Sequence, residues 1–319
     1  MQRRGQVQFN GKALLLPCFF PSVSTVKTNL APSQYIQILQ ALGFPQFLVS
    51  AYDYVNSEDS ERDAFLENLT RAKENGSTVL LDSGNYESFW ERDPNWTAGC
   101  FRDACRSLGP NLAFCFDDQS PPLDRDGAAE AAISRLDADL LALPGQCVLP
   151  IVHGHSSILP HIVGTVCRRV KPKMVAVAER ELGDGITERC RTVAEIRKRL
   201  DEFESYCPLH LLGTGNPFSI LAFVLSGADS FDGLEWCQTV ADFSTGQLSH
   251  FQHWDLYASS SPVGSASGIP YPQRTLAHNL VFWADFMKGV REFVERGTPS
   301  VLVEGILRKV RPILPVEIP

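Results

Sequence analysis

The chain has 319 residues, of which 44% are hydrophobic and 21% charged, and its formal net charge is −8 at pH 7. This length is normal for a single eight-stranded α/β barrel, and the apolar content can fill a large core. The negative charge argues against a large nucleic-acid footprint, because proteins that hold a duplex usually carry a basic surplus or stripe. No apolar run reaches the ~20 residues that span a bilayer, so we expect no membrane partner.

The nine cysteines are scattered singly, without a CxxC or CxC pair. Such spacing is typical of buried thiols in a reducing compartment rather than of a disulfide framework. The first residues, MQRRGQVQFNG, include two arginines but no apolar stretch that would mark a signal peptide. The sequence therefore predicts a cytoplasmic protein.

Eight short apolar runs, each bounded by turn residues, predict buried parallel strands. Helical patterns fall between most of them, and this alternation favours one irregular (β/α)8 TIM barrel over residues 1–319. A doubly wound open sheet is the alternative, although no GxGxxG or GxxxxGK[ST] motif supports a nucleotide-binding version of it. The predicted strands are 13–20, 46–50, 78–82, 112–116, 147–152, 174–178, 209–213 and 228–232.

Six segments are predicted to be helical from their apolar spacing and from proline or acidic residues near their starts and glycine near their ends. After the eighth strand the rhythm breaks, and the Ser- and Gly-rich segment 241–274 is expected to be a long loop or excursion, a reduced insertion. It either covers the barrel mouth or is a disordered connector. The predicted helices are 32–42, 60–76, 124–143, 186–203, 216–227 and 276–297.

Six predicted strands end on a polar or glycine residue. The C-terminal ends of parallel barrel strands meet at one mouth, so we expect Asp82 and Asp232 to be neighbours although they lie far apart in the chain. Two carboxylates at one mouth suit displacement at a sugar carbon, where one attacks and the other handles protons. A single Asp at a strand end caps the next helix about as often as it takes part in catalysis. The set of six strand ends is therefore stronger evidence than any one of them. The endings are Asp82, Asp117, His153, Glu179, Gly213 and Asp232.

These segments resemble the tRNA-guanine transglycosylases, the queuine and archaeosine tRNA-ribosyltransferases, whose fold is an irregular (β/α)8 barrel. LLDSGNYESF (80–89) is similar to the family's DSGG[FY]Q block, and CFDDQSPPLDRDGAAEAA (115–132) is similar to its FDE block. LLGTGNPFSILAFVLSGADSFDG (211–233) resembles an MGxGxP segment followed by an FD motif. Further likenesses are LLPCFFPSVSTVK (15–27) to the first strand, PIVHG (150–154) to an IVQGG-type strand end, and TLAHNLVFWADFMKGVREF (275–293) to the closing helix.

The resemblance implies a role for each matched residue. Asp232 takes the position of the nucleophile that bonds to the ribose C1′, and Asp82 that of the general acid/base. Asp117 takes the position that reads the N1/N2 edge of guanine, where an ionised carboxylate can accept both N–H bonds. The other positions around the base are Tyr86, which would stack on the purine, Leu212 on its opposite face, His153 in place of a glutamine that contacts O6, its neighbour Gly154, and Gly213, which lets the backbone come close.

The chain also departs from the family pattern. The family's structural zinc uses a CxCxxC cluster and a histidine that aligns with His278, but residues 233–277 contain only Cys237, so we expect no metal cofactor. EWCQT (235–239) stands where the family has a PTR sequence that helps engage RNA. Glu179 replaces part of a Gly-Gly clamp and either sets a charge near the base or pairs with Arg180 or another cation in a structural role.

The resemblance thus implies a pentosyltransferase that exchanges a guanine or 7-deazaguanine base by covalent double displacement, on a nucleotide that must be unstacked to reach the mouth. The departures leave the acceptor open between tRNA, DNA and non-standard RNA, since relatives also act on DNA in bacterial modification systems, some linked to antiviral defence. One alternative is a deazaguanine-binding module that has lost exchange, which the retained aspartates disfavour. Another is an unrelated barrel enzyme, disfavoured by the lack of a strand-end lysine. A homodimer and partner proteins are left open.

Overall fold

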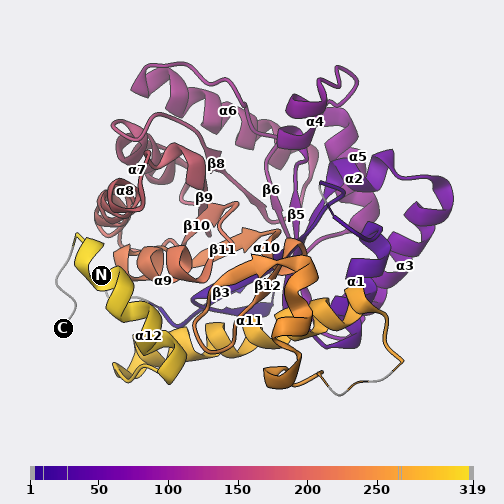
Figure 1. The fold of residues 1–319 in the computed structure, drawn as a ribbon. Coiled ribbons are helices and arrows are strands. Elements are labelled where there is room, and N and C mark those ends of the chain that lie inside the picture. The colour runs from indigo at the N-terminus through magenta and orange to yellow at the C-terminus, as the bar shows by residue number, and fades with distance from the viewer. Residues whose placement is uncertain (1–3, 10, 27, 265, 267, 316–319) are drawn as a thin grey trace.

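The structure is a computed structural model that describes residues 4–9, 11–26, 28–264, 266 and 268–315. Its centre is a parallel sheet that is nearly closed into a TIM-like barrel and ringed by helices (Figure 1). In spatial order the strands are β7 (Val148–Leu149), β6 (Leu112–Phe114), β5 (Thr78–Asp82), β4 (Gln46–Ser50), β3 (Cys18–Val23), β11 (Ser230–Gly233), β10 (Leu209–Leu212), β9 (Val175–Ala178) and β8 (Ile151–Val152).

The two ends of this sheet, β7 and β8, are halves of one predicted strand that is interrupted at Pro150. On one side, the Cys115 N–H donates to the Leu149 carbonyl (2.9 Å), and on the other the Ala176 N–H donates to the Pro150 carbonyl (3.0 Å). The missing N–H of proline interrupts the strand but leaves its carbonyl free to accept a hydrogen bond. The expected eight-stranded α/β barrel is therefore present, with the fifth strand in two pieces.

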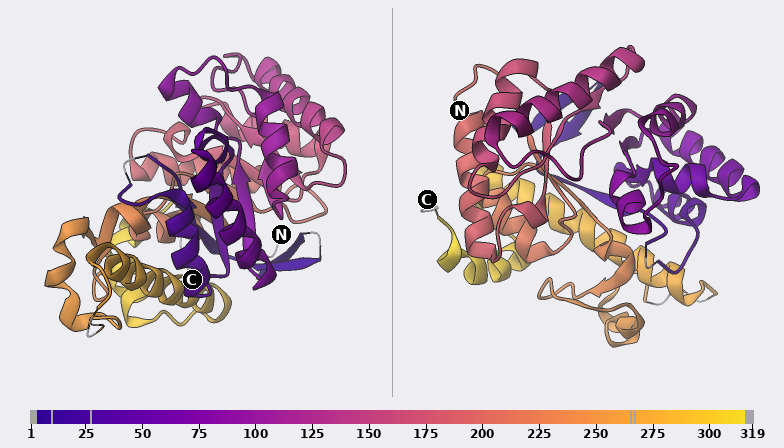
Figure 2. Two further views of the ribbon diagram at one scale, coloured as in Figure 1. Left: turned by 90° about the vertical axis from the view of Figure 1, so that its right-hand side faces the viewer. Right: turned by 90° about the horizontal axis from the view of Figure 1, so that it is seen from above.

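The predicted first strand, 13–20, is two strands in the structure. Its first part belongs to β2 (Lys12–Leu15), which pairs antiparallel with β1 (Gln6–Phe9), whereas the barrel strand β3 begins only at Cys18. Pro17 cannot donate a ladder hydrogen bond and divides the run. The hairpin β1–β2 lies at one end of the barrel (Figure 2, left), where Phe9, Leu14 and Leu16 join the cluster of side chains inside it.

Side chains of the barrel strands alternate between two apolar layers, as period-two geometry requires. Phe20 and Leu48 point into the barrel, where they pack with the hairpin residues. Phe19 and Val49 point outward and pack against the helices; the Phe19 ring stacks on Trp283 with centroids 4.2 Å apart. The interior is filled at the hairpin end, so free space remains at the opposite, C-terminal mouth.

Helices cover the outer face of the sheet, and none of those in the described part of the chain is long and apolar enough to cross a membrane. All six predicted helices are present, with ends shifted by up to five residues. Those not predicted are α2, α4, α5, α7, α10 and α12. The helices are α1 (Pro32–Ala41), α2 (Ala51–Asn56), α3 (Asp59–Glu74), α4 (Asn85–Glu91), α5 (Ala98–Leu108), α6 (Arg125–Ala142), α7 (Leu159–Val170), α8 (Ile186–Leu200), α9 (Pro217–Ser226), α10 (Glu235–Gln238), α11 (Tyr271–Arg296) and α12 (Val301–Val310).

The segment predicted to be a long loop, 241–274, has local structure over much of its described part. A hairpin of β12 (Thr239–Ala241) and β13 (Leu248–His250) leads into the short 3-10 helices η2 (Phe251–Leu256) and η3 (Ala258–Ser260). Buried Trp254 anchors η2, with the Arg274 guanidinium 4.7 Å from its ring centroid. The described residues of this segment do not line the cavity at the barrel mouth.

Asp139 on α6 links this helix to α5 and to the backbone that follows β6, directly before Asp117. This fully buried carboxylate accepts hydrogen bonds from the Phe116 N–H (2.7 Å) and from Arg102 Nε on α5 (2.7 Å). A buried carboxylate is tolerated when such donors satisfy it, and removing it leaves both partly buried donors without this partner.

We therefore expect Asp139→Ala to lower the free energy of unfolding by about 3 kcal/mol or more. Asp137→Ala is the matched control, because Asp137 lies on the exposed face of the same helix and should change stability by less than about 0.5 kcal/mol. Equilibrium denaturation by urea measures both. Equal effects of the two substitutions would contradict the role given to Asp139.

Candidate active site

Three aspartates from distant parts of the chain meet at the C-terminal mouth of the barrel. Asp82 is the last residue of β5, Asp117 follows β6, and Asp232 lies in β11. All three line one cavity of about 440 Å³. The parallel strands bring them together because their C-terminal ends open on the same side of the sheet.

Eight of the nine residues singled out from the sequence line this cavity. Gly154 does not: its backbone N–H donates to Glu181 Oε2 (3.0 Å) beside the mouth. Its place in the site is therefore to hold a neighbouring carboxylate. The eight lining residues are Asp82, Tyr86, Asp117, His153, Glu179, Leu212, Gly213 and Asp232.

Three donors fix the carboxylate of Asp232. Ser22 Oγ donates to its Oδ2 (2.8 Å), and the Gly213 N–H donates to its Oδ1 (3.1 Å). His210 Nε2 lies 3.1 Å from the same Oδ1, and because a carboxylate only accepts, the Nε2–H must be the donor. In a neutral ring, His210 Nδ1 then accepts from Ser230 Oγ (2.8 Å), so that both ring nitrogens have a partner. These contacts hold the Asp232 carboxylate in one orientation at the mouth. Neither Ser22 nor His210 was identified from the sequence.

Asp82 has a different environment. Burial and the charge of Asp117 raise its pKa to about 7, with a further contribution from Asp232. The Gly84 N–H donates to its Oδ2 (2.9 Å), which limits this rise. Gly84 has φ +72°, and a Cβ there would lie 2.3 Å from the Cβ of Tyr52, so the turn requires glycine. A carboxyl with a pKa near 7 can both give and take a proton at neutral pH.

Two further buried carboxyl groups lie at the mouth, and neither was predicted. Burial raises the pKa of Glu235 to about 7, with contributions from the charges of Asp232 and Glu179. Its carboxylate fits against Gly215, where a Cβ would lie 1.8 Å from Oε2. Burial, followed by the charge of Asp82, raises the pKa of Glu87 well above its usual value. The mouth therefore holds two carboxyl groups with a pKa of about 7, Asp82 and Glu235, and a third, Glu87, whose pKa is also raised.

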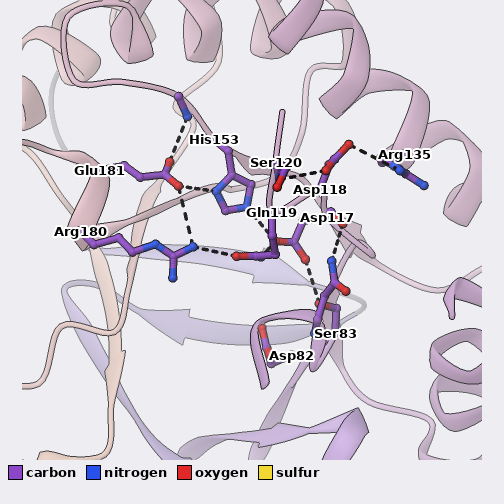
Figure 3. Close-up of polar contacts among 12 residues, drawn as sticks. Asp82, Ser83, Asp117, Asp118, Gln119, Ser120, Arg135, His153, Arg180 and Glu181 are labelled. Carbon is purple, nitrogen blue, oxygen red and sulfur yellow. Dashed lines mark hydrogen bonds and ion pairs between the residues drawn. The ribbon is translucent and has the colours of Figure 1, made fainter. Parts of the chain in front are cut away.

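Asp117, His153 and Glu181 form a linear hydrogen-bonded network (Figure 3). His153 Nε2 lies 2.7 Å from Asp117 Oδ2, and Nδ1 lies 2.7 Å from Glu181 Oε1. Burial alone would lower the pKa of His153, but the hydrogen bonds and charges of the two carboxylates raise it to about 9. At neutral pH the ring is an imidazolium that donates from both nitrogens.

Gln119 extends this network toward the rim (Figure 3). Its amide Nε2 donates to Asp117 Oδ2, while its Oε1 accepts from Arg180 NH2 (2.7 Å). The guanidinium of Arg180 lies 4.6 Å from the ring centroid of Tyr86. Ser83 Oγ donates to the other oxygen of Asp117 (3.0 Å). The Asp117 carboxylate therefore accepts hydrogen bonds from several donors. One of these donors, Gln119, itself lines the cavity.

Glu179 has features of both roles that the sequence left open. It lines the cavity, and it also forms an ion pair, but its partner is Arg189 (2.8 Å) rather than Arg180. Arg189 Nε donates to the Gly183 carbonyl as well (2.8 Å), so the guanidinium is held in place. The negative charge of Glu179 is therefore at the mouth but shared with a fixed cation.

The zinc site of the resembled family does not fit the residues present. His278 Nε2 donates to the Ala241 carbonyl (2.7 Å), and its ring packs edge-on against Phe243. Cys237 Sγ donates to the Leu234 carbonyl (3.2 Å). Within the described ranges, no group of three or more His, Cys, Asp or Glu side chains could hold a metal ion. His278 is a packed core residue.

No protein-family model matches this chain, and no curated protein sequence matches it significantly. The function must therefore be argued from the residues and geometry of the mouth. The carboxylate of Asp232 is fixed by hydrogen bonds, and the carboxyl of Asp82 has a pKa of about 7. The imidazolium of His153 is held between the carboxylates of Asp117 and Glu181.

The network around His153 makes stability depend on pH. Because the pKa of His153 is raised from about 6.5 when unfolded to about 9 when folded, its contribution is full below pH 6.5 and is lost as pH rises through 9. We expect the wild type to lose about 2 kcal/mol more stability than His153→Gln between about pH 7.5 and pH 9.5. The raised pKa values of Asp82 and Glu235, about 7, act mainly below this window.

Urea denaturation at several pH values measures this difference. The control is His155→Gln, an exposed neighbour that should keep the wild-type pH dependence. The same slope in wild type and His153→Gln would show that His153 is not held as an imidazolium.

Proposed function

We propose that the mouth exchanges a guanine or 7-deazaguanine base on a nucleotide by covalent double displacement. The observation that carries this proposal is the pairing of an oriented carboxylate, Asp232, with a carboxyl of raised pKa, Asp82, in one cavity. One group suits attack at a sugar carbon and the other suits proton transfer to and from the base. The sequence resemblance assigns the same two roles to the same two residues.

In the first half-reaction, an oxygen of Asp232 attacks C1′ of the target nucleotide as the C1′–N9 bond breaks. The departing base takes a proton from the protonated form of Asp82, which becomes a carboxylate. In the second half-reaction that carboxylate removes the proton from N9 of the incoming base, whose nitrogen attacks C1′ and releases Asp232. Asp82 returns to its protonated form, so protons and charge balance over the cycle.

Base recognition would rest on Asp117. Its carboxylate can accept from N1–H and the 2-amino group of guanine, whereas adenine offers no such pair. The Gln119 amide now donates to the Oδ2 of Asp117, so an entering base can replace one N–H donor with another while Ser83 and His153 keep their bonds. Tyr86 and Leu212 also line the cavity and supply apolar contacts for the two faces of a planar base.

The substituent on C7 of a deazaguanine would meet the rim. Glu179 favours an amine there by charge attraction, but its ion pair with Arg189 offsets much of that attraction. We therefore expect the pocket to accept guanine and neutral 7-deazaguanines as well as amine-bearing ones.

Base exchange into nucleic acid tests the proposal, with labelled guanine and pools of tRNA, single-stranded RNA and DNA. Asp232→Asn should reduce exchange to background, because an amide cannot form the glycosyl ester. Asp82→Asn should slow exchange by roughly 10²–10⁴-fold. Wild-type exchange should be fastest near pH 7, because Asp82 must be protonated for one half-reaction and ionised for the other.

The matched control is Asp118→Asn. Asp118 adjoins Asp117 but pairs with Arg135 (3.5 Å) and does not line the cavity, so exchange should stay close to wild type. Tight binding of guanine without exchange on any of the three polymers would overturn the proposal and leave a base-binding module.

A further inference from the structure

Three aromatic side chains on α4 are exposed beside the cavity. Tyr86 is 44% exposed, Phe89 52% and Trp90 64%. Their rings touch in series: the centroids of Tyr86 and Trp90 are 6.0 Å apart, and those of Phe89 and Trp90 are 5.9 Å apart, all edge to face. The other four tryptophans, at 96, 236, 254 and 283, are buried, so the exposure of Trp90 is unusual for this chain.

This aromatic row is continuous with the candidate active site. Tyr86 lines the cavity and contacts Trp90, so the row runs from the mouth outward along one turn of helix. A base in the cavity beside Tyr86 would therefore have the rings of Phe89 and Trp90 as its nearest exposed aromatic surface. Exposed aromatic rings next to a base pocket suit the stacking of neighbouring bases, because every base offers a π-face.

The charges at the mouth favour stacking over contacts to phosphates. The two arginines that line the cavity are both engaged: Arg189 pairs with Glu179, and Arg180 donates to Gln119 and lies over Tyr86. Carboxyl groups outnumber cations among the lining residues. A nucleic acid whose backbone alone was recognised would be repelled here.

We propose that Phe89 and Trp90 form a stacking platform for an unpaired nucleotide next to the one whose base enters the cavity. The acceptor is then a single-stranded or locally unpaired nucleic acid, held mainly by stacking. This inference rests on the proposed function, which makes a base the ligand of the cavity. The platform itself is tested by measuring oligonucleotide binding and not by measuring turnover.

Trp90 itself reports on the platform, since it is the exposed tryptophan in a chain whose other four are buried. Short single-stranded oligonucleotides containing guanine should quench its fluorescence, and a duplex of the same sequence should do so only weakly. Trp90→Ala should weaken oligonucleotide binding by roughly 5- to 100-fold. The loss of oligonucleotide affinity in Trp90→Ala should be the same at low and high salt. The oligonucleotide affinity of the wild type should fall only slightly as the salt concentration rises.

Controls separate the platform from the pocket and from folding. Leu141→Ala removes an exposed apolar side chain on α6 (86% exposed) and should leave oligonucleotide affinity unchanged. Calorimetry should give Trp90→Ala the wild-type affinity for free guanine, and its melting temperature should match the wild type. Asp232→Asn should bind oligonucleotides and quench normally although it no longer exchanges bases. Absence of exchange by the wild type would count against the proposed function and leave the platform standing.

Oligonucleotide affinity that is unchanged by Trp90→Ala would overturn the platform, whether or not base exchange occurs. So would equal quenching by duplex, or a steep salt dependence. A protein partner that protects Trp90 from quenching by acrylamide while oligonucleotides do not would instead identify the aromatic row as a protein-docking surface.

Discussion

The closure of the sheet at Pro150 is the constraint on which the site depends. The interrupted strand 148–152 pairs with β6 on one side and β9 on the other, so the strand ends that carry Asp117, His153 and Glu179 are neighbours. The hairpin β1–β2 fills the other end of the barrel, so the cavity that the polar side chains line opens at the C-terminal mouth. An open sheet of the same strands would place β8 at the far edge, six strands away from β5, which carries Asp82.

A second constraint is electrostatic. Placing several carboxyl groups at one buried mouth is costly, because burial and like charge disfavour ionisation. The structure meets this cost in two ways. Asp117, Glu181 and Glu179 are balanced by His153 and Arg189, whereas the pKa values of Asp82 and Glu235 rise to about 7. The division leaves Asp82 and Glu235 able to exchange protons near neutral pH, while Asp232 is held by three hydrogen-bond donors.

Apolar runs bounded by turn residues predicted the strands well. β4 and β5 begin and end where the sequence indicates, because both are buried and neither contains a proline. The apolar spacing of Leu159, Ile162 and Val166 is also typical of a helix, so α7 could have been predicted from the same signal as the other helices. The short α4, seven residues long, depends on the turn at Gly84 and has too few residues to show a period.

The site could be predicted only in part, because strand ends identify which residues gather but not what they contact. Glu181 lies 28 residues from His153 in the chain, in a 3-10 turn, and nothing local links the two. Arg189 was missed as the partner of Glu179 for the same reason. His210 had a usable signal, since a histidine inside the apolar run LHLL must be satisfied by hydrogen bonds.

The central claim is that Asp232 forms a covalent bond to the sugar of its substrate. Intact-protein mass spectrometry on an acid-quenched reaction, with a guanine-containing single-stranded oligonucleotide, tests it most directly. The account predicts an adduct whose mass equals the protein plus the oligonucleotide less one guanine, and peptide mapping should locate it at Asp232. An adduct located on another residue, or none in reactions that release guanine, would contradict the account.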